Sequence, residues 1–134
     1  MAYQYLLDTN ILSDLVRHPQ GQVFQHIAIV GEDSICTSIT VACELRFGAA
    51  KSGSSRLEQQ LEQILAVLPI LPLEIPVDLY YARIRKHLEQ EGTPIGPNDL
   101  LIAAHALTLN LILVTANTRE FERVPSLHLE NWLL

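Results

Sequence analysis

Short apolar runs alternate along the chain with longer segments of helical periodicity. The runs at Tyr3–Leu7, Ser34–Ser38 and Leu111–Val114 are short and mainly apolar or β-branched, which predicts strands. A last strand is expected near Leu127–Leu129, whereas Pro69–Glu74 holds two prolines and is at best an edge strand. Strands that alternate with helices favour a parallel sheet with right-handed crossovers, so the predicted fold class is α/β.

Apolar residues at helical spacing occupy the segments between these strands. We expect Asn10 and Thr40 to cap two of the helices, and Pro97 to take the first position of a third, which is apolar nearly all round and therefore buried. The expected helices run from Asn10 to about Arg17, over Gln22–Val30, from Thr40 to Ala50, around Leu57–Leu68, over Val77–Glu91 and Asn98–Leu109, and briefly near Thr118–Arg123.

Composition narrows the class of protein further. The 134 residues are 49% hydrophobic and 18% charged, which excludes a disordered chain and predicts one globular domain over residues 1–134. No run is long and apolar enough for a membrane span, and the first ten residues lack a basic region, so we expect a cytoplasmic protein. Cys36 and Cys43 fit neither a zinc pair nor a redox motif, and we expect both in the core.

A net charge of −6 argues against non-specific binding of a polyanion. The total charge does not exclude a local site, however, because carboxylates gathered around a divalent ion would lower the total and still allow phosphate binding. The positions of the acids therefore matter more than their number.

Acidic side chains stand where the predicted strands pass into helices. Asp8 directly follows the first strand, Glu44 lies in the helix after the second, and Asp99 opens the buried helix. Asn117 and Glu120 follow the strand at 111–114. Each residue alone has an ordinary explanation, as a helix cap, a partner of the helix dipole, a turn residue or a solvated acid. Together they predict one site, because the carboxyl ends of parallel strands meet at one edge of a sheet.

Several carboxylates at one sheet end repel each other unless cations neutralise them. Oxygen ligands favour Mg²⁺ or Mn²⁺ over zinc, and such ions activate water and stabilise phosphoryl charge. Other chemistry has little support, since the chain lacks a nucleotide-binding glycine loop, a GxSxG nucleophile and an HExxH pair. The histidines have no ligand spacing, and His105 is expected to be a hydrogen-bonded core residue.

The ordered set of motifs resembles the PIN-domain ribonucleases, and within them the VapC toxins of bacterial toxin–antitoxin pairs. The resemblance rests on LLDTNILSDL, SITVACELRFGAAKS, GTPIGPNDLLIAAHA and LVTANTREFERVPSLHLENW, and it spans nearly the whole chain. It implies an α/β/α sandwich around a short, mainly parallel sheet, and RNA hydrolysis with Mg²⁺ or Mn²⁺. By motif position the metal ligands would be Asp8, Glu44 and Asp99, with Asn10 and Thr115 as polar supports.

One position departs from the pattern of the family. Many members place an aspartate after the last core strand, where this chain has Asn117. We therefore expect Glu120 to supply the fourth catalytic and metal-binding acid, with Asn117 in a supporting role.

The resemblance also implies partners. These are a cognate antitoxin, which would dock on the helices at Val41–Leu68, a second copy in a homodimer, and a structured RNA such as tRNA whose cleavage inhibits translation and growth. Candidate RNA contacts are the basic residues near the acids in sequence, Arg17, Arg46, Lys51 and Arg119. A DNA-directed metal nuclease and a non-catalytic RNA- or protein-binding module with a vestigial acidic site remain as alternatives.

Overall fold

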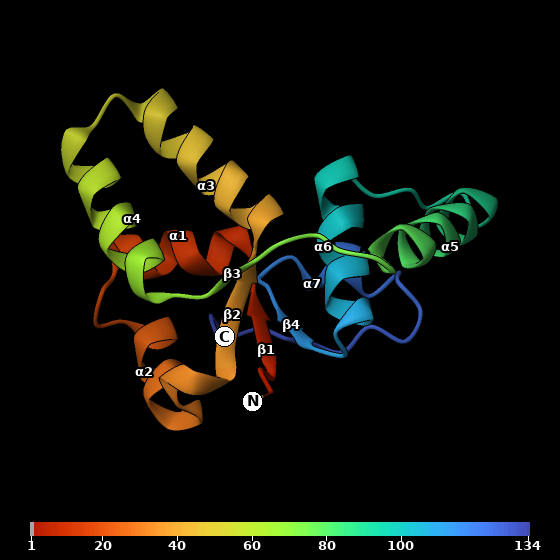
Figure 1. Ribbon diagram of the computed structural model, residues 1–134, viewed down its shortest axis with the longest axis horizontal. Coiled ribbons are helices and arrows are strands. Elements are labelled where there is room, and N and C mark those ends of the chain that lie inside the picture. Colours follow the sequence, from red (N-terminus) through yellow and green to blue (C-terminus); the bar gives the residue numbers. More distant parts are fainter. Residues whose placement is uncertain (1) are drawn as a thin grey trace.

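The computed structural model describes residues 2–134, which form one five-stranded parallel sheet with helices around it (Figure 1). The strands are β1 (Tyr5–Leu7), β2 (Ile35–Ser38), β3 (Ile70–Leu71), β4 (Ile112–Val114) and β5 (Leu129–Glu130). The helices are α1 (Thr9–Arg17), α2 (Gln22–Val30), α3 (Ile39–Ser52), α4 (Ser55–Val67), α5 (Val77–Gln90), α6 (Pro97–Thr108) and α7 (Thr118–Phe121), with a 3₁₀ turn at Glu32–Ser34.

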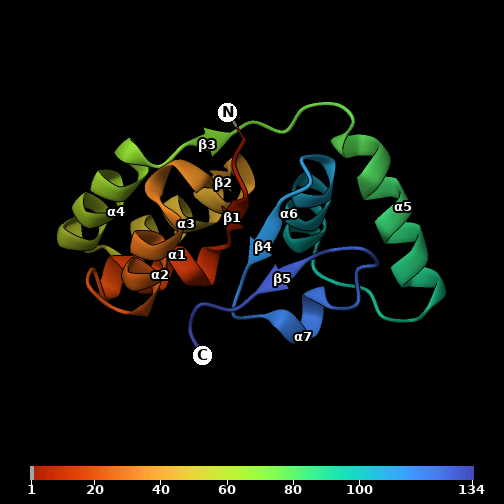
Figure 2. The ribbon, with the colours of Figure 1, turned by 90° about the horizontal axis from the view of Figure 1, so that it is seen from below.

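The strand order is β3-β2-β1-β4-β5, and every pairing is parallel. Figure 2 shows α1–α4 gathered on one side of the sheet and α5 and α6 on the other. The predicted α/β class and the α/β/α layering are therefore confirmed. The proline-rich segment contributes only the two-residue β3, which lies at one edge of the sheet as expected.

The central strands and α6 form the core. Leu6 and Leu7 of β1 and Leu113 and Val114 of β4 are fully buried, as expected for strands covered on both faces. Helix α6 is buried along most of its length, and its His105 hydrogen-bonds through Nδ1 to Ser38 Oγ at 2.8 Å, so the prediction of a core histidine is confirmed. Within residues 2–134, no helix has both the length and the apolar character that a membrane crossing requires.

Three local predictions were wrong. Asp8 rather than Asn10 caps α1, and Ser38 rather than Thr40 caps α3. Both helices begin directly after a strand, so the residue at the strand–helix junction, rather than a later polar residue, accepts one of the free backbone N–H groups. Cys36 is buried in β2 as expected, but Cys43 is exposed because it lies on the outer face of α3.

Candidate active site

Asp8 lies at the centre of the acidic site, immediately after β1, and only 4% of it is exposed. Its Oδ1 accepts the backbone N–H of Thr9 at 2.8 Å, and its Oδ2 accepts the Thr115 hydroxyl at 2.8 Å. Burial raises the pKa of Asp8, although both hydrogen bonds oppose the shift. The fold thus orients this carboxylate with two donors while leaving its charge poorly solvated.

Glu44 approaches from α3 and is partly buried. Its Oε1 accepts the Thr9 hydroxyl at 2.5 Å, and its Oε2 accepts the Asn98 side-chain amide at 3.4 Å. Glu44 adds to the negative potential that raises the pKa of Asp8. One glutamate therefore joins α3 to the beginnings of both α1 and α6.

Asp99 and Glu120 form a carboxyl pair at the beginning of α6. Burial, followed by the hydrogen bond and the charge of Glu120, raises the pKa of Asp99 to about 7, with smaller contributions from Asp8 and Glu44. Glu120 accepts the backbone N–H of Gly96 at 3.2 Å and the side-chain amide of Asn117. The structure therefore brings Glu120 to the same place as the other three acids, although it comes from α7.

The polar residues expected to support the acids also lie here. Thr115 bonds to Asp8, and it accepts the backbone N–H of Asn117 at 3.0 Å. Asn10 Oδ1 accepts the backbone N–H of Ala116 at 3.0 Å, which ties the turn after β4 to α1. The side-chain amide of Asn117 donates a hydrogen bond to Glu120.

Two residues of the site were not predicted from the sequence. Thr9 donates to both Asp8 and Glu44, through its backbone and its hydroxyl, and Asn98 donates to Glu44. Each stands next to one of the predicted acids in the sequence. That adjacency is the only signal in the chain that could have pointed to them, because their bonds to Glu44 cross from one helix to another.

Basic side chains do not neutralise the four acids. Among residues 2–134, no lysine or arginine forms an ion pair with any of them, and the ion pairs present are Asp14–His18, Arg46–Glu62 and Arg85–Glu89. Like charges held together in this way favour a bound cation, and a set of carboxylate, hydroxyl and amide oxygens fits a hard divalent ion.

The acids are not arranged as a ready-made metal cage. In the described part of the chain, no three Asp, Glu, His or Cys side chains are close enough together to form one. Glu44 and Glu120 are each turned toward neutral donors. The donor set therefore fits a divalent ion, provided that these two glutamates exchange such bonds for the ion.

The candidate RNA contacts do not form one patch. Arg17 lines a groove of about 290 Å³ between α1, α3 and α4 that also contains Glu44. Arg46 is already paired with Glu62 of α4, while Lys51 and Arg119 are exposed on α3 and α7. Of the four basic residues, Arg17 shares this groove with Glu44.

Comparison with known families decides the assignment. The model of the PIN domain matches residues 5–127, which span every strand from β1 to β4 and all four acids. The chain belongs to the PIN-domain family. This PIN domain is 40% identical over 130 residues to Ribonuclease VapC2 of Rickettsia felis, with 96% of this chain and 97% of that protein covered. It is 34% identical to the tRNA(fMet)-specific endonuclease VapC of Shigella flexneri, with 96% and 98% covered.

Solved structures of similar proteins lead to the same family. The PIN domain superposes with a TM-score of 0.86 and 38% identity on a chain of VapBC2 from Rickettsia felis bound to a promoter DNA fragment, with 96% of this chain and 98% of that chain covered. For DNA-bound VapBC from Salmonella typhimurium the TM-score is 0.87 at 32% identity, with 97% and 98% covered. The chain therefore groups with the VapC ribonucleases, and this family is consistent with a divalent metal cofactor.

Proposed function

We propose that this PIN domain is the Mg²⁺- or Mn²⁺-dependent endoribonuclease toxin of a toxin–antitoxin pair, acting in the cytoplasm on structured RNA such as tRNA. The observation that supports it best is the convergence of Asp8, Glu44, Asp99 and Glu120 from separate elements at one end of the sheet. The names of the relatives, which are ribonucleases and a tRNA-specific endonuclease, favour RNA over DNA and an enzyme over a vestigial site.

Asp8, Glu44 and Asp99 would hold the metal, and Glu120 would complete its surroundings. When bound, a divalent ion supplies activated water and charge stabilisation at the scissile phosphate. The chain contributes the orientation of these carboxylates. The Thr9 N–H and the Thr115 hydroxyl hold both oxygens of Asp8, and the Thr9 hydroxyl holds Glu44.

Among residues 2–134, no histidine forms a hydrogen bond or an ion pair with the four acids, since His105 bonds to Ser38 and His18 to Asp14. The proposed mechanism therefore assigns no histidine to take a proton from the RNA. Attack by water rather than by the ribose 2′-hydroxyl leaves a 5′-phosphate and a 3′-hydroxyl. Sequencing of cleaved RNA ends after brief expression tests this directly, and cyclic phosphate ends would contradict the proposal.

We also propose that an antitoxin covers an apolar groove between α2 and α4. The groove has a volume of about 280 Å³ and includes Phe24, Ile64 and Val67, of which Phe24 is 47% and Val67 82% exposed. Its α4 wall lies within the 41–68 region expected to bind an antitoxin, and the solved relatives are VapBC complexes. Co-expression of a cognate antitoxin with the Val67→Asp variant tests the contact, since a buried charge there should release active toxin.

The homodimer is the remaining partner in the proposal. Light scattering coupled to size exclusion gives the mass in solution directly, with a dimer near twice 15.0 kDa expected. A monomer at all concentrations would contradict the dimer and leave the nuclease proposal intact.

The decisive test of the nuclease itself combines chelation with metal replacement. EDTA should stop RNA cleavage, and Mg²⁺ or Mn²⁺, but not Zn²⁺, should restore it. Cleavage that persists after thorough chelation would exclude the metal mechanism.

A further inference from the structure

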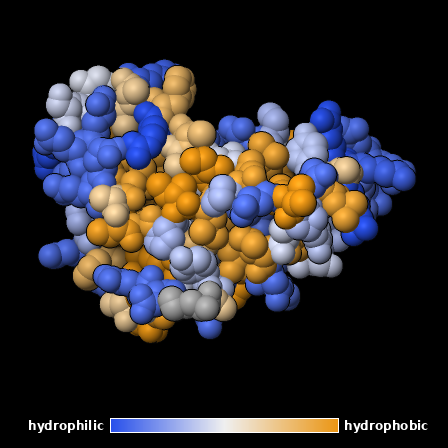
Figure 3. All heavy atoms as spheres, in the orientation of Figure 1, coloured by the Kyte–Doolittle hydropathy of each residue, from blue (hydrophilic) through white to orange (hydrophobic). Residues whose placement is uncertain are grey.

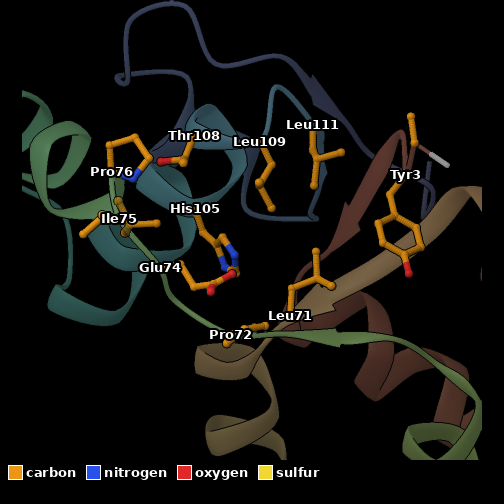
Figure 4. A pocket seen from close by; sticks show the side chains of 12 residues that line it. Tyr3, Leu71, Pro72, Glu74, Ile75, Pro76, His105, Thr108, Leu109 and Leu111 are labelled. Carbon is orange, nitrogen blue, oxygen red and sulfur yellow. The ribbon is translucent and has the colours of Figure 1, made fainter.

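A cavity of about 480 Å³ lies between α6 and the segment that connects β3 to α5 (Figure 4). This segment, residues 72–76, passes over the C-terminal half of α6, as Figure 1 shows. The walls are mainly apolar, from Tyr3, Leu71, Val77, Leu109 and Leu111. Its volume falls in the range of about 300–1,000 Å³ that is usual for small-molecule sites.

The cavity is separate from the acidic site. Tyr3 and Leu111 precede β1 and β4, whereas Asp8 and Thr115 follow the same two strands. None of the four acids lines the cavity. Its surroundings are partly apolar, since Ile75 is 87% exposed, and Figure 3 shows hydrophobic side chains gathered across the middle of this face.

One polar side chain of the core reaches this cavity. His105 is only 1% exposed, yet its ring lines the cavity. Its Nδ1 is hydrogen-bonded to Ser38 Oγ, and within residues 2–134 no protein group bonds to its Nε2. No buried side-chain nitrogen in this part of the chain lacks a partner, so Nε2 is open to the cavity, where a water or a polar group of a ligand can bond to it.

The hydrogen bonds of Ser38 assign the tautomer of His105. Ser38 Oγ accepts the backbone N–H of Thr40 at 3.1 Å, so its own proton is free to be donated. His105 Nδ1 is the acceptor within reach, and it must then lack a proton. Neutral His105 therefore carries its proton on Nε2, and it presents an N–H donor to the cavity.

Glu74 supplies the second polar group. Its carboxylate lies on the cavity wall, and Figure 4 shows it beside the His105 ring. The two groups do not form an ion pair with each other. A donor and an acceptor that share a cavity without meeting can be bridged by a group that accepts from one and donates to the other.

We propose that this cavity binds a small amphipathic molecule with a carboxamide head on a compact apolar body. The amide oxygen accepts from His105 Nε2–H, the amide N–H donates to Glu74, and the apolar body fills the space beside Leu109 and Leu111. A carboxylate head cannot serve, because it lacks a donor for Glu74 and carries the same charge. The proposal is independent of the nuclease activity.

Benzamide, benzoate and toluene are matched probes of this site, since they differ in the head and share the ring. In NMR titrations of the full chain, benzamide should shift the His105 Nε2 and Leu111 resonances with a Kd of about 1 mM, as expected for a fragment. Benzoate and toluene should bind at least about fivefold more weakly, which corresponds to the loss of one net hydrogen bond.

Two variants test the assignment of the walls. Glu74→Gln keeps an acceptor and removes the charge, so benzoate should gain about two- to fivefold in affinity, as for a partly screened charge. Thr108→Leu places extra carbon atoms in the cavity and should abolish benzamide shifts while RNA cleavage stays unchanged. Circular dichroism melts of both variants establish that they are folded.

The outcomes are distinguishable. Equal binding of the three probes, shifts confined to another surface, or benzamide binding that survives Thr108→Leu in a folded protein would each overturn the proposal. Loss of benzamide binding as protein concentration rises would also overturn it, because a second copy of the chain would then be the occupant.

Discussion

The acidic site and the cavity at His105 each bury a titratable side chain, and they do so with opposite consequences. Asp8 is 4% and His105 is 1% exposed. Burial raises the pKa of Asp8 and lowers that of His105, so it opposes the charged form in both cases. Asp8 faces other acids, so the negative charge of this site is not neutralised without a bound cation. His105 is neutral, and its Nε2–H is the one ring group without a protein partner within residues 2–134.

The acidic site therefore favours a bound cation, whereas the cavity at His105 favours a neutral ligand. At the acidic site, Glu44, Asp99 and Glu120 all add negative potential, and no lysine or arginine among residues 2–134 pairs with these acids. At the cavity, the charge of Glu74 acts on the His105 pKa, and Glu74 is exposed. Substitutions at the acidic site should therefore change metal binding and catalysis, and those at the cavity should change only stability and small-molecule binding.

The largest effect is expected when a metal-binding acid is neutralised. Asp8→Asn or Asp99→Asn should lower the RNA cleavage rate by about 1,000-fold or more, because several kcal/mol of charge stabilisation are lost. Single-turnover cleavage assays measure the rate. Asp33→Asn is the matched control, since Asp33 is exposed in the turn before β2 and should leave the rate unchanged. Near-normal cleavage by both site variants would refute the assignment.

Metal binding to the free protein should have the next largest effect. A divalent ion that binds only the folded state adds about 1.4 kcal/mol of stability at ten times its Kd. Mn²⁺ should therefore raise the melting temperature of the unaltered protein and leave that of Asp99→Asn unchanged. An equal rise in both proteins would place the ion elsewhere.

The pH dependence of this stabilisation follows from Asp99. Its folded-state pKa is raised to about 7, above 3.8 in the unfolded chain, so the proton favours the folded state. The stability of the metal-free protein contributed by Asp99 is complete below pH 3.8 and is lost as the pH rises through about 7. Bound metal displaces this proton, so Mn²⁺ should raise the melting temperature more at pH 8 than at pH 6.

Thermal melts at pH 6 and pH 8, with and without Mn²⁺, measure the direction of this pH dependence. Asp99→Asn should remove most of the slope in the metal-free protein. A larger Mn²⁺ effect at pH 6 than at pH 8 would contradict the raised pKa.

Glu120 should have an intermediate effect. Glu120→Gln removes one carboxylate charge and should weaken Mn²⁺ binding by about tenfold, as for groups that support the ligands of a metal. Asn117→Ala should have a smaller effect, because it only frees Glu120 from one hydrogen bond. Calorimetric Mn²⁺ titrations compare the two, and an unchanged isotherm for Glu120→Gln would remove this residue from the site.

The sequence predicted the layered fold and the place of the acids well, and it predicted their partners poorly. Runs such as Leu111–Val114 and the nearly all-apolar α6 carry local signals of strand and buried helix, and these were confirmed. The bonds from Thr9 and Asn98 to Glu44 join three helices, and no local periodicity encodes which helices meet. The apolar cavity at His105 was missed for the same reason, since residues far apart in the sequence form it, from Tyr3, the segment 71–77, α6 and Leu111.

Ser38 gives the smallest expected effect on activity, and it tests whether the acidic site and the cavity at His105 are independent. It caps α3, which carries Glu44, and it also bonds to His105. Ser38→Ala should lower the free energy of unfolding by about 2 kcal/mol, the sum of a lost cap and an unsatisfied buried nitrogen. Ser54→Ala removes only the cap of α4, and it should cost about 1 kcal/mol. Urea melts measure both values, and the difference between them is the contribution of the His105 bond. Because Thr9 and Asn98 still hold Glu44 in Ser38→Ala, its Mn²⁺ affinity should change by less than about twofold. A tenfold loss of Mn²⁺ affinity in the folded variant would show that the cap of α3 couples the acidic site to the cavity.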